Sequence, residues 1–350
     1  MPWQGERPAA GNFPLPELRT IVGAERNIGW AMARKSESES ARLEDAARAG
    51  WLYYIAGNTQ DEIADKLGVS RQTAQRLVSL AISHRLIKVR LDHPIAECLR
   101  LAELLKDKFA LQLCEVVPAD PASRSTTVGV AEATAAALER RLESRRPIVI
   151  ALGSGRTLRA AADQLPPMDC PQHKIVSLVG NIAPDGSASF YDVITRVADA
   201  VRAPHYPMPL PVIASSPAEK KLLLAQKPVK YVVDLARRAD VTFVGVGHLG
   251  EGAPLLQDGF VTRDEMRALV KAGAVGEIVG WAFDRQGRMI EGLTNERVAS
   301  VALDGPVKRL VIGAAMGQAK ADAIAGALAG RLLGGLITNE TMARRLLEYS

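Results

Sequence analysis

Short apolar runs alternate with amphipathic stretches through most of the chain after residue 148, and this alternation restricts the fold more than any other feature. The runs have the length and composition of buried strands: Ile148–Leu152, Ile175–Val179, Val241–Val246, Ile278–Phe283 and Leu310–Ile312. The stretches with helical periodicity are Thr157–Leu165, Val193–Val201, Val229–Ala239, Thr262–Ala272 and Ala315–Leu333. Such alternation predicts a doubly wound α/β domain with a mainly parallel sheet, whose ligands bind beyond the carboxyl ends of the strands.

Nearer the N-terminus, Thr59–Leu80 has the pattern of two short helices joined by a tight turn. Thr59 and Glu62 have the spacing of a capping box, in which each side chain accepts a backbone N–H of the first turn. Gly68 can adopt the left-handed conformation that ends a helix, and Ser70 is a good N-cap for the next one. The stretch is therefore expected to form a helix-turn-helix.

The outward face of the second helix carries long hydrogen-bonding side chains, as a helix that enters the major groove requires, because Arg can contact guanine and Gln adenine. From Arg71 to Arg90 there are five basic residues and no acidic one, which suits a phosphate backbone. Leu86–Leu91 alternates apolar and basic residues and could form the strand of a wing. The residues expected to contact DNA are Gln60, Ser70, Arg71, Gln72, Thr73, Gln75, Arg76, Lys88 and Arg90. The alternative is an ordinary αα-hairpin with a solvated polar face.

The 350 residues are enough for two domains. Residues 1–40 contain several prolines and a polar run without periodicity, so we expect a flexible N-terminal arm. Residues 41–94 would form the helix-turn-helix domain, with its first helix at Arg42–Ile55. Residues 95–350 would form an effector-binding and oligomerisation domain. The amphipathic helix Ile95–Phe109 would be either the first helix of this domain or a connecting helix.

Composition excludes several classes of protein. The net charge of +5 is compatible with DNA binding but does not establish it. Cys98, Cys114 and Cys170 are scattered, which excludes a disulfide framework or a Cys-type zinc site. The histidines form no HExxH motif, and we expect neither a metal nor a cofactor. No uncharged apolar run reaches the ~18 residues of a membrane span, and no signal-peptide pattern is present, so a soluble cytoplasmic protein is predicted.

The end of the first strand carries the sequence Gly153, Ser154, Gly155, Arg156 and Thr157, directly before a helix. Glycines, hydroxyls, free N–H groups and the helix dipole together suit a phosphate or another anion. The GK[ST] ending of a Walker loop is absent. The dinucleotide fingerprint is also poor, because its third glycine is missing and no acidic residue follows ~20 residues later. A plain tight turn between strand and helix is the alternative.

Later strand ends carry further polar residues: His248 and Glu251, then Glu277 and Asp284, and finally Lys320. His248 and Glu251 could form an acid/base pair, but a loop histidine without a fixed partner is more often a binding or surface residue. Lys320, near the start of a helix, could close over a phosphate as a point charge. It could equally be an ordinary solvated lysine.

Five motifs follow one another in the order TQDEIADKLGVSRQTAQRLV, GSGRTL, the block from Val241 to Gly247, KAGAVGEIVGWAFDRQG, and AKADAIAGALAGRLLGGLITNETMARRLL. In these motifs the chain resembles the SorC-type sugar-binding transcriptional regulators (SorC/DeoR group), over nearly everything after the N-terminal arm. The helix-turn-helix is generic, whereas the Gly-Ala-Val-Gly and Lys-Ala motifs are specific. The resemblance implies a winged helix-turn-helix joined to an effector domain with a fold like that of glucosamine-6-phosphate deaminase and ribose-5-phosphate isomerase. It also implies a homo-oligomer, a dimer or tetramer, on operator DNA.

Effectors in this family are sugars, polyols or their phosphates, which gives the predicted strand ends a role. The residues that the resemblance implies for phosphate binding are Gly155, Arg156, Thr157 and Lys320, and those implied for the sugar hydroxyls are Glu277 and Asp284. The full set expected at the effector site adds Gly153, Ser154, Asn181, Ser189, Asp192, Gly247 and His248.

The chain also departs from the family pattern at Ser189–Val197, where aromatic residues and Asp192 replace a more polar, glutamine-containing stretch. Asn181, Ser189 and Asp192 could therefore set a different sugar or polyol preference. Arg156 replaces a hydroxyl residue found in some relatives.

These features predict a ligand-controlled repressor or activator of a carbohydrate or polyol catabolic operon. Effector binding would shift the spacing between two recognition helices, which requires only a different affinity for two assemblies. A sugar-phosphate isomerase or deaminase is the rival, but it needs a further carboxylate base at a strand end that the sequence does not offer, so we expect no enzyme and no catalytic residue. A third alternative is a constitutive DNA-binding protein whose effector pocket has decayed.

Overall fold

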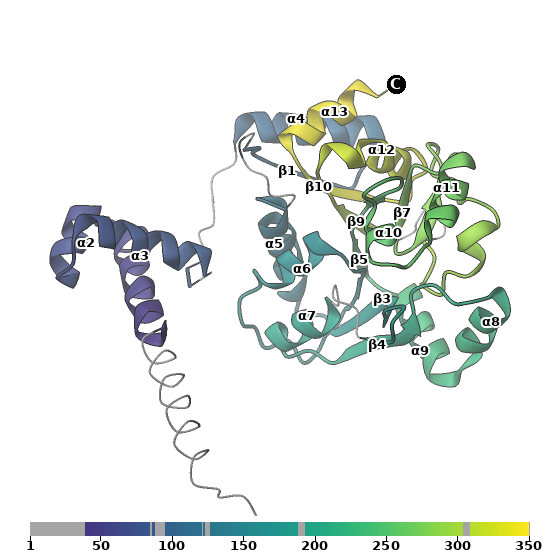
Figure 1. Cartoon of the computed structure of the whole chain (residues 1–350), viewed down its shortest axis with the longest axis horizontal. Helices are drawn as coiled ribbons and strands as arrows, with labels where there is room; N and C mark the ends of the chain where they lie inside the picture. Colours follow the sequence, from purple (N-terminus) through teal and green to yellow (C-terminus); the bar gives the residue numbers. More distant parts are fainter. Residues whose placement is uncertain are drawn as a thin grey trace, which may run out of the picture. The chain divides into compact units, whose positions relative to one another are not determined.

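The computed structural model describes residues 39–84, 86–87, 95–120, 122, 127–187, 193–303 and 309–349. The chain divides into two compact units, Met1–Arg90 and Leu91–Ser350 (Figure 1). We refer to them as the N-terminal unit and the C-terminal unit.

The described part of the N-terminal unit consists of a helix at residues 39–54, α2 (Gln60–Leu67) and α3 (Arg71–Ser83). Its small core is made of apolar residues from all three helices: Ala46, Ala49, Ile63, Ala64, Ala74, Leu77, Val78 and Ala81. These side chains recur at helical spacing, so each helix buries one face and leaves the other in solvent.

Local capping fixes the turn between α2 and α3. The backbone N–H of Thr59 donates to the Glu62 carboxylate (2.7 Å), and the N–H of Glu62 donates to the Thr59 hydroxyl (3.3 Å). Gly68 ends α2 with a φ of +65°, and the Ser70 side chain accepts the N–H of Thr73 at the start of α3. The predicted capping box, turn and N-cap are thus confirmed.

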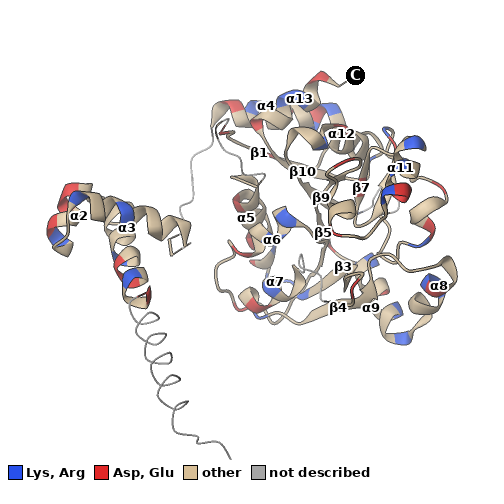
Figure 2. Cartoon of the chain, viewed as in Figure 1, with Lys and Arg blue, Asp and Glu red and all other residues tan. Residues whose placement is uncertain are grey.

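The outer face of α3 is exposed and has no acidic residue, whereas α2 carries acidic residues in its first turn (Figure 2). The exposed positions of α3 include five predicted DNA contacts, namely Arg71, Gln72, Thr73, Gln75 and Arg76. Arg71 lies 3.4 Å from Asp61, but both side chains are mostly exposed and such a pair is weak. Lys88 and Arg90, and most of the predicted wing, lie outside the described residues.

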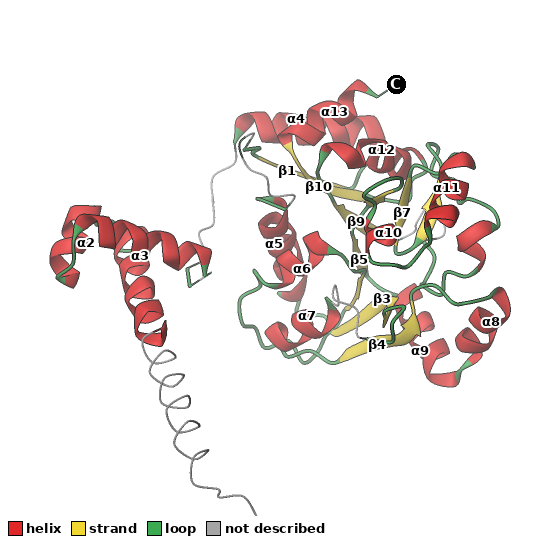
Figure 3. Cartoon of the chain, viewed as in Figure 1, coloured by secondary structure: helices red, strands yellow, loops and turns green. Residues whose placement is uncertain are grey.

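Seven parallel strands form the main sheet of the C-terminal unit. Their spatial order is β1 (Leu113–Val117), β10 (Gly335–Asn339), β9 (Leu310–Ala314), β5 (Val241–Val244), β2 (Val149–Leu152), β3 (Lys174–Ile182) and β4 (His205–Pro211). Helices cover both faces, which confirms the doubly wound α/β architecture (Figure 3).

Each face of the sheet has its own core. One is covered by α5 (Val130–Leu142), α6 (Arg156–Ala162) and α7 (Ile194–Val201), and the other by α4 (Ala96–Phe109), α9 (Lys227–Arg237), α12 (Ala321–Ala329) and α13 (Glu340–Glu348). In β2, Ile150 and Leu152 belong to the first core and Ala151 to the second. Side chains of a strand alternate between the two faces, so a buried parallel strand reads as a continuous apolar run.

A second, smaller sheet lies after β5 and consists of β6 (Gly247–His248), β7 (Gly276–Ile278) and β8 (Trp281–Phe283), all antiparallel. The prediction of one strand at Ile278–Phe283 was therefore wrong. The run folds back on itself because Val279 and Gly280 both have positive φ, 48° and 89°. The remaining helices are α8 (Pro217–Ala225), α10 (Pro254–Gln257), α11 (Arg263–Lys271), η1 (Leu293–Glu296) and η2 (Gln318–Lys320).

The prediction of one helix at Ala315–Leu333 was also too long. The segment begins with the loop after β9 and the single 3₁₀ turn η2, and α12 covers only Ala321–Ala329. Strands β1, β4 and β10 were not predicted. Within the described ranges, none of the helices combines the length and apolar character needed to cross a membrane.

Glycines allow α12 to approach the turn after β8. A methyl group at Gly330 would lie 2.8 Å from the carbonyl oxygen of Gln286 and closer still to the Cα of Gly287. We expect Gly330→Ala to lower the free energy of unfolding by about 1–3 kcal/mol, because backbone must move to admit the methyl group. Denaturant unfolding measures this difference.

Gly334→Ala is the matched control, because its methyl group would meet nothing closer than 3.5 Å. Equal losses of stability in the two variants would show that the close approach of backbone at Gly330 is not the cause.

Candidate functional site

The order of the strands places three loops side by side. From β2 the chain proceeds through β3 to β4 at one edge; it then returns to β5, beside β2, and proceeds through β9 to β10 in the other direction. The order reverses between β2 and β5, and ligands of doubly wound sheets bind outside the carboxyl ends of the strands at such a reversal. The loops that follow β2, β5 and β9 meet there.

The loop after β2 brings Ser154, Gly155, Arg156 and Thr157 to this place. Gly155 has a φ of +123° and no neighbour within 4 Å of a Cβ built on it, so the backbone is open at this point. Helix α6 starts at Arg156 but has only seven residues. We therefore assign the positive charge of this loop to the Arg156 guanidinium rather than to a helix dipole.

The loop after β5 leads into the small sheet, where Gly247 pairs with Glu277 across β6 and β7. A Cβ at position 247 would overlap the carboxylate of Glu277, so glycine makes room for this side chain. The Glu277 Oε2 atom accepts the N–H of Gly280 at 2.7 Å. Burial raises the pKa of the Glu277 carboxyl, opposed by this hydrogen bond and by Lys320. The hairpin turn thus holds a carboxyl group at a fixed position.

The loop after β9 ends in η2, which carries Lys320. Burial lowers the pKa of the Lys320 amine; the negative charge of Glu277 opposes this shift, and the positive charge of Arg156 adds to it. The three groups come from η2, β7 and α6, and their charges act on one another across a common space. Two cations thus share that space with the Glu277 carboxyl group.

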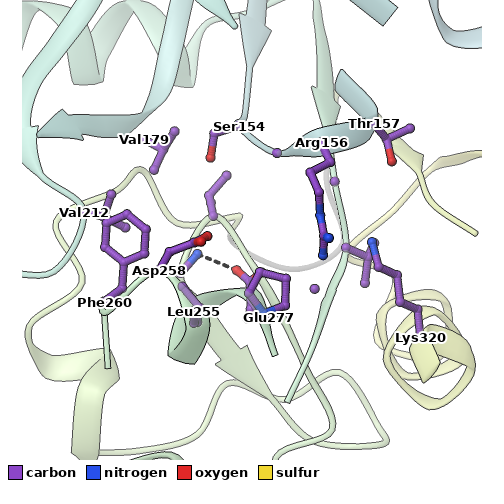
Figure 4. A pocket seen from close by; sticks show the side chains of 17 residues that line it. Ser154, Arg156, Thr157, Val179, Val212, Leu255, Asp258, Phe260, Glu277 and Lys320 are labelled. Carbon is purple, nitrogen blue, oxygen red and sulfur yellow. Dashed lines mark hydrogen bonds between the residues drawn. The ribbon is translucent and has the colours of Figure 1, made fainter. Parts of the chain in front are cut away.

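The common space is a cavity of about 100 Å³. Its lining residues are Ser154, Gly155, Arg156, Thr157, Val179, Val212, Gly245, Val246, Gly247, Pro254, Leu255, Asp258, Phe260, Glu277, Val279, Gly280 and Lys320. Figure 4 shows Arg156, Glu277 and Lys320 on one side of the cavity, and Val179, Val212 and Phe260 together on the other. The volume is below the ~300–1,000 Å³ of typical drug-sized pockets, so a ligand of a few carbons suits it better than a nucleotide.

Seven of the predicted effector-site residues line this cavity, namely Ser154, Gly155, Arg156, Thr157, Gly247, Glu277 and Lys320. Gly153 and Asn181 line a much smaller neighbouring cavity with Ser154 and Ser177. Ser189 and Asp192 lie outside the described residues. His248 adjoins the cavity through Gly247 but does not line it.

Asp284 is not brought to the cavity. Its carboxylate accepts the backbone N–H groups of Gln286 and Arg288, each at 2.9 Å, and pairs with the Arg288 guanidinium. These bonds hold the turn after β8. The structure therefore gives Asp284 a local role in this turn instead of the expected contact with sugar hydroxyls.

Sequence reasoning missed Asp258, Phe260 and the apolar side of the cavity. Asp258 directly follows the short helix α10. Burial raises the pKa of its carboxyl group, and the positive charge of Arg156 lowers it. These residues follow a loop helix rather than a strand, so the strand-end rule could not locate them. In the described ranges there is no cluster of three or more His, Cys, Asp or Glu side chains that could hold a metal ion.

Comparison with known proteins agrees with this geometry. A family model described as "Putative sugar-binding domain" matches residues 93–348. The erythritol catabolism regulatory protein EryD of Brucella abortus is 33% identical over 302 residues, which are 86% of this chain and 96% of EryD. The full-length sorbitol operon regulator SorC of Klebsiella pneumoniae superposes with a TM-score of 0.66 at 26% identity, covering 87% of this chain and 98% of SorC. The chain belongs to the SorC-type sugar-binding transcriptional regulators.

Membership of the SorC family settles the class of the protein. The transcriptional regulator LsrR of Klebsiella pneumoniae is a further relative, 30% identical over 337 residues, which are 94% of this chain and 98% of LsrR. These matches extend through both units of the chain, and the proteins are named as regulators. The prediction of a regulator rather than an isomerase or deaminase is thereby confirmed, with DNA and a small sugar-type effector as its partners.

Proposed function

We propose that the effector of this regulator is a short polyol or sugar that carries an anionic group, most simply a phosphate, and that it binds in the cavity between Arg156, Glu277 and Lys320. The observation that carries this proposal is the meeting of two cations, two carboxyl groups and an apolar wall in one small cavity. Effector binding would change the affinity of the protein for operator DNA.

Each part of such a ligand has a chemical counterpart in the cavity. Arg156 offers a planar guanidinium that can contact two phosphate oxygens, and Lys320 adds a point charge. The N–H of Gly280 fixes one oxygen of the Glu277 carboxyl group. The other oxygen can accept hydrogen bonds from hydroxyl groups of the ligand. Phe260 and Val212 can cover the carbon face of the ligand. A neutral polyol would offer the two cations no negative charge.

The relatives direct the choice of compounds. EryD is named for erythritol catabolism, and the SorC structure for the sorbitol operon. We therefore propose a ligand of four to six carbons and a role in the control of genes for its catabolism, in the cytoplasm. Asn181 beside the neighbouring small cavity, and Ser189 and Asp192 from the sequence, remain candidates for setting the preference among such ligands.

A thermal-shift panel tests the proposal. It should contain tetritols, pentitols and hexitols, the matching aldoses, and the phosphate of each. We expect at least one phosphate to raise the Tm by several degrees at ~100 times its Kd, where ligand binding stabilises the folded state by about 2.7 kcal/mol. If no compound shifts the Tm, the pocket has no effector of this class; if polyols act as strongly as their phosphates, the anion site is wrong.

The N-terminal unit supplies the DNA contacts in this proposal. We expect Gln72→Ala and Arg76→Ala each to weaken operator binding about 5- to 100-fold and to relax base preference, since one good base contact contributes roughly 1–3 kcal/mol of discrimination. Effector binding should be unchanged. Gel-shift titrations with operator and random DNA, alongside the thermal-shift assay, measure both properties.

Arg48→Ala is the control for the loss of a positive charge, because Arg48 lies in the helix at residues 39–54 and pairs with Glu44 on an exposed surface. Operator binding that falls equally in Arg48→Ala and Arg76→Ala would indicate a general charge effect. Loss of effector binding in Gln72→Ala would contradict the division of labour between the two units.

Dimers or tetramers would place two recognition helices on successive half-sites of the operator. We propose that the C-terminal unit holds the protomers together and that the effector alters the spacing of the N-terminal units. Sedimentation of the full chain with and without operator DNA gives the number of protomers.

A further inference from the structure

His248 is the second residue of β6, directly after Gly247, which lines the cavity. Its ring nitrogen Nδ1 is buried and has no hydrogen-bond partner among the residues that the structure describes. A buried polar atom without a partner costs free energy, so in native proteins it usually has a functional or solvent-related explanation. The proposed binding mode leaves this atom unused.

The elements packed against β6 are β7, α10, η2 and α12. The charged residues on them or directly after them are Glu277, Asp258, Lys320 and Asp322, and Arg156 acts on the imidazole from α6. Asp322 is already engaged, since it accepts the Tyr349 hydroxyl at 2.5 Å and pairs with Arg285 at 3.2 Å. The groups that act on the imidazole most directly are the two cations.

The surroundings of His248 in the free protein favour its neutral form. Burial lowers the pKa of its imidazole most, and the positive charges of Lys320 and Arg156 lower it further. An anion between those two cations would reverse part of this effect, because it cancels their charge and attracts a proton.

We propose that His248 takes up a proton when an anion binds between Arg156 and Lys320, and that its charge then stabilises the bound anion from outside the cavity lining. The inference rests on the proposed function and deepens it, because it couples effector binding to pH. A site of this kind favours a dianion over a neutral analogue by more than its two permanent cations would.

The direction of the coupling follows from linkage. The pKa of the imidazole is lowered in the free protein and would be higher in the complex. Binding therefore takes up a proton at pH values between these two pKa values. Affinity is then highest at pH values below the free-state pKa and declines as the pH rises through the pKa of the complex. An acidic shift should therefore strengthen binding.

Sulfate is the probe of choice, because it stays a dianion from pH 6 to 8 and contributes no proton of its own. Calorimetric titration of the full-length protein at pH 7 in PIPES and in imidazole buffer gives the number of protons taken up, since the two buffers differ in ionisation enthalpy. We expect a net uptake of about 0.3–0.8 proton per sulfate, and a Kd that rises at least ~3-fold from pH 6 to pH 8.

His248→Asn and His248→Gln should both bind sulfate without proton uptake and with a flat pH profile. Two variants are needed because each amide imitates a different ring nitrogen, and their Tm values show whether both fold. Glu277→Gln and Asp258→Asn test the two carboxyl groups of the cavity, and proton uptake should persist in both.

The outcomes are distinct. Proton uptake that persists in both His248 variants, or that disappears only in Glu277→Gln or only in Asp258→Asn, overturns the role of His248 while the anion site stands. A heat of sulfate binding that is equal in the two buffers for the wild type would also overturn the role of His248. If sulfate does not bind, or if Arg156→Gln binds it as well as the wild type, the anion site itself fails and the role of His248 with it.

Discussion

A Lys320→Met variant is expected to bind a phosphorylated effector roughly 10- to 100-fold more weakly than the wild type, because a hydrogen bond to a charged group is worth about 1.5–3 kcal/mol. Lys320 lies in the cavity, and burial and Arg156 already disfavour its charge. A phosphate would add a negative charge that favours the protonated amine, as Glu277 already does. Titration calorimetry with the best phosphate from the thermal-shift panel measures the loss.

Arg159→Gln is the matched control, because Arg159 lies one turn after Arg156 on α6 and does not line the cavity. It removes a charge of the same sign from the helix that carries Arg156, so affinity should fall by no more than ~3-fold if direct contact is what counts. An equal loss in Lys320→Met and Arg159→Gln would mean that only the general field of the protein attracts the ligand. Unchanged affinity in Lys320→Met would remove the lysine from the site.

Gly247→Ala is expected to abolish most effector binding, by at least ~10-fold, without unfolding the protein. The new methyl group would occupy the place of the Glu277 carboxylate, and this flexible side chain can move aside while the backbone stays. The displaced carboxyl would lose its bond to Gly280 and its position towards the ligand hydroxyls. Calorimetry and a Tm measurement on the same sample separate the two effects.

Gly334→Ala is the control, because Gly334 does not line the cavity. Its methyl group would meet nothing closer than 3.5 Å. We expect this variant to retain affinity within ~3-fold of the wild type, as expected for a substitution without a clash. A Gly247→Ala protein that binds normally would contradict the role of the Glu277 carboxylate.

The helix-turn-helix was predictable because its signals are local. Thr59 and Glu62 are three residues apart, Gly68 permits the left-handed turn, and Ser70 caps the next helix. Each of these residues bonds only to residues within a few positions of itself in the sequence. Apolar residues at helical spacing then define the buried face. No long-range information is needed for any of these features.

The polar side of the cavity was predictable for a different reason. Parallel strands bring their carboxyl ends to one edge, so residues far apart in sequence, such as Arg156 and Lys320, meet when each follows a strand. The rule failed for Asp284, whose carboxylate is satisfied within its own turn. It also missed Phe260, which enters the cavity from a loop between helices.

The strands that were missed show where periodicity fails. β4 contains three prolines, at positions 207, 209 and 211, and is tolerated only because it lies at the edge of the sheet. β10 follows the apolar residues of α12 so closely that the two read as one continuous segment. The β7–β8 hairpin was hidden in the same way, because only the backbone conformation of Val279 and Gly280 divides the apolar run.

The central claim is that a ligand in the cavity of the C-terminal unit controls DNA binding by the N-terminal unit. The most direct test is an operator titration of the full-length protein, with DNA selected by the protein from a random pool, in the absence and presence of saturating phosphorylated ligand. We expect a change of at least ~5-fold in operator Kd for the wild type and none for Lys320→Met. An operator Kd that is the same with and without every ligand that binds, or that responds equally in Lys320→Met, would contradict the central claim.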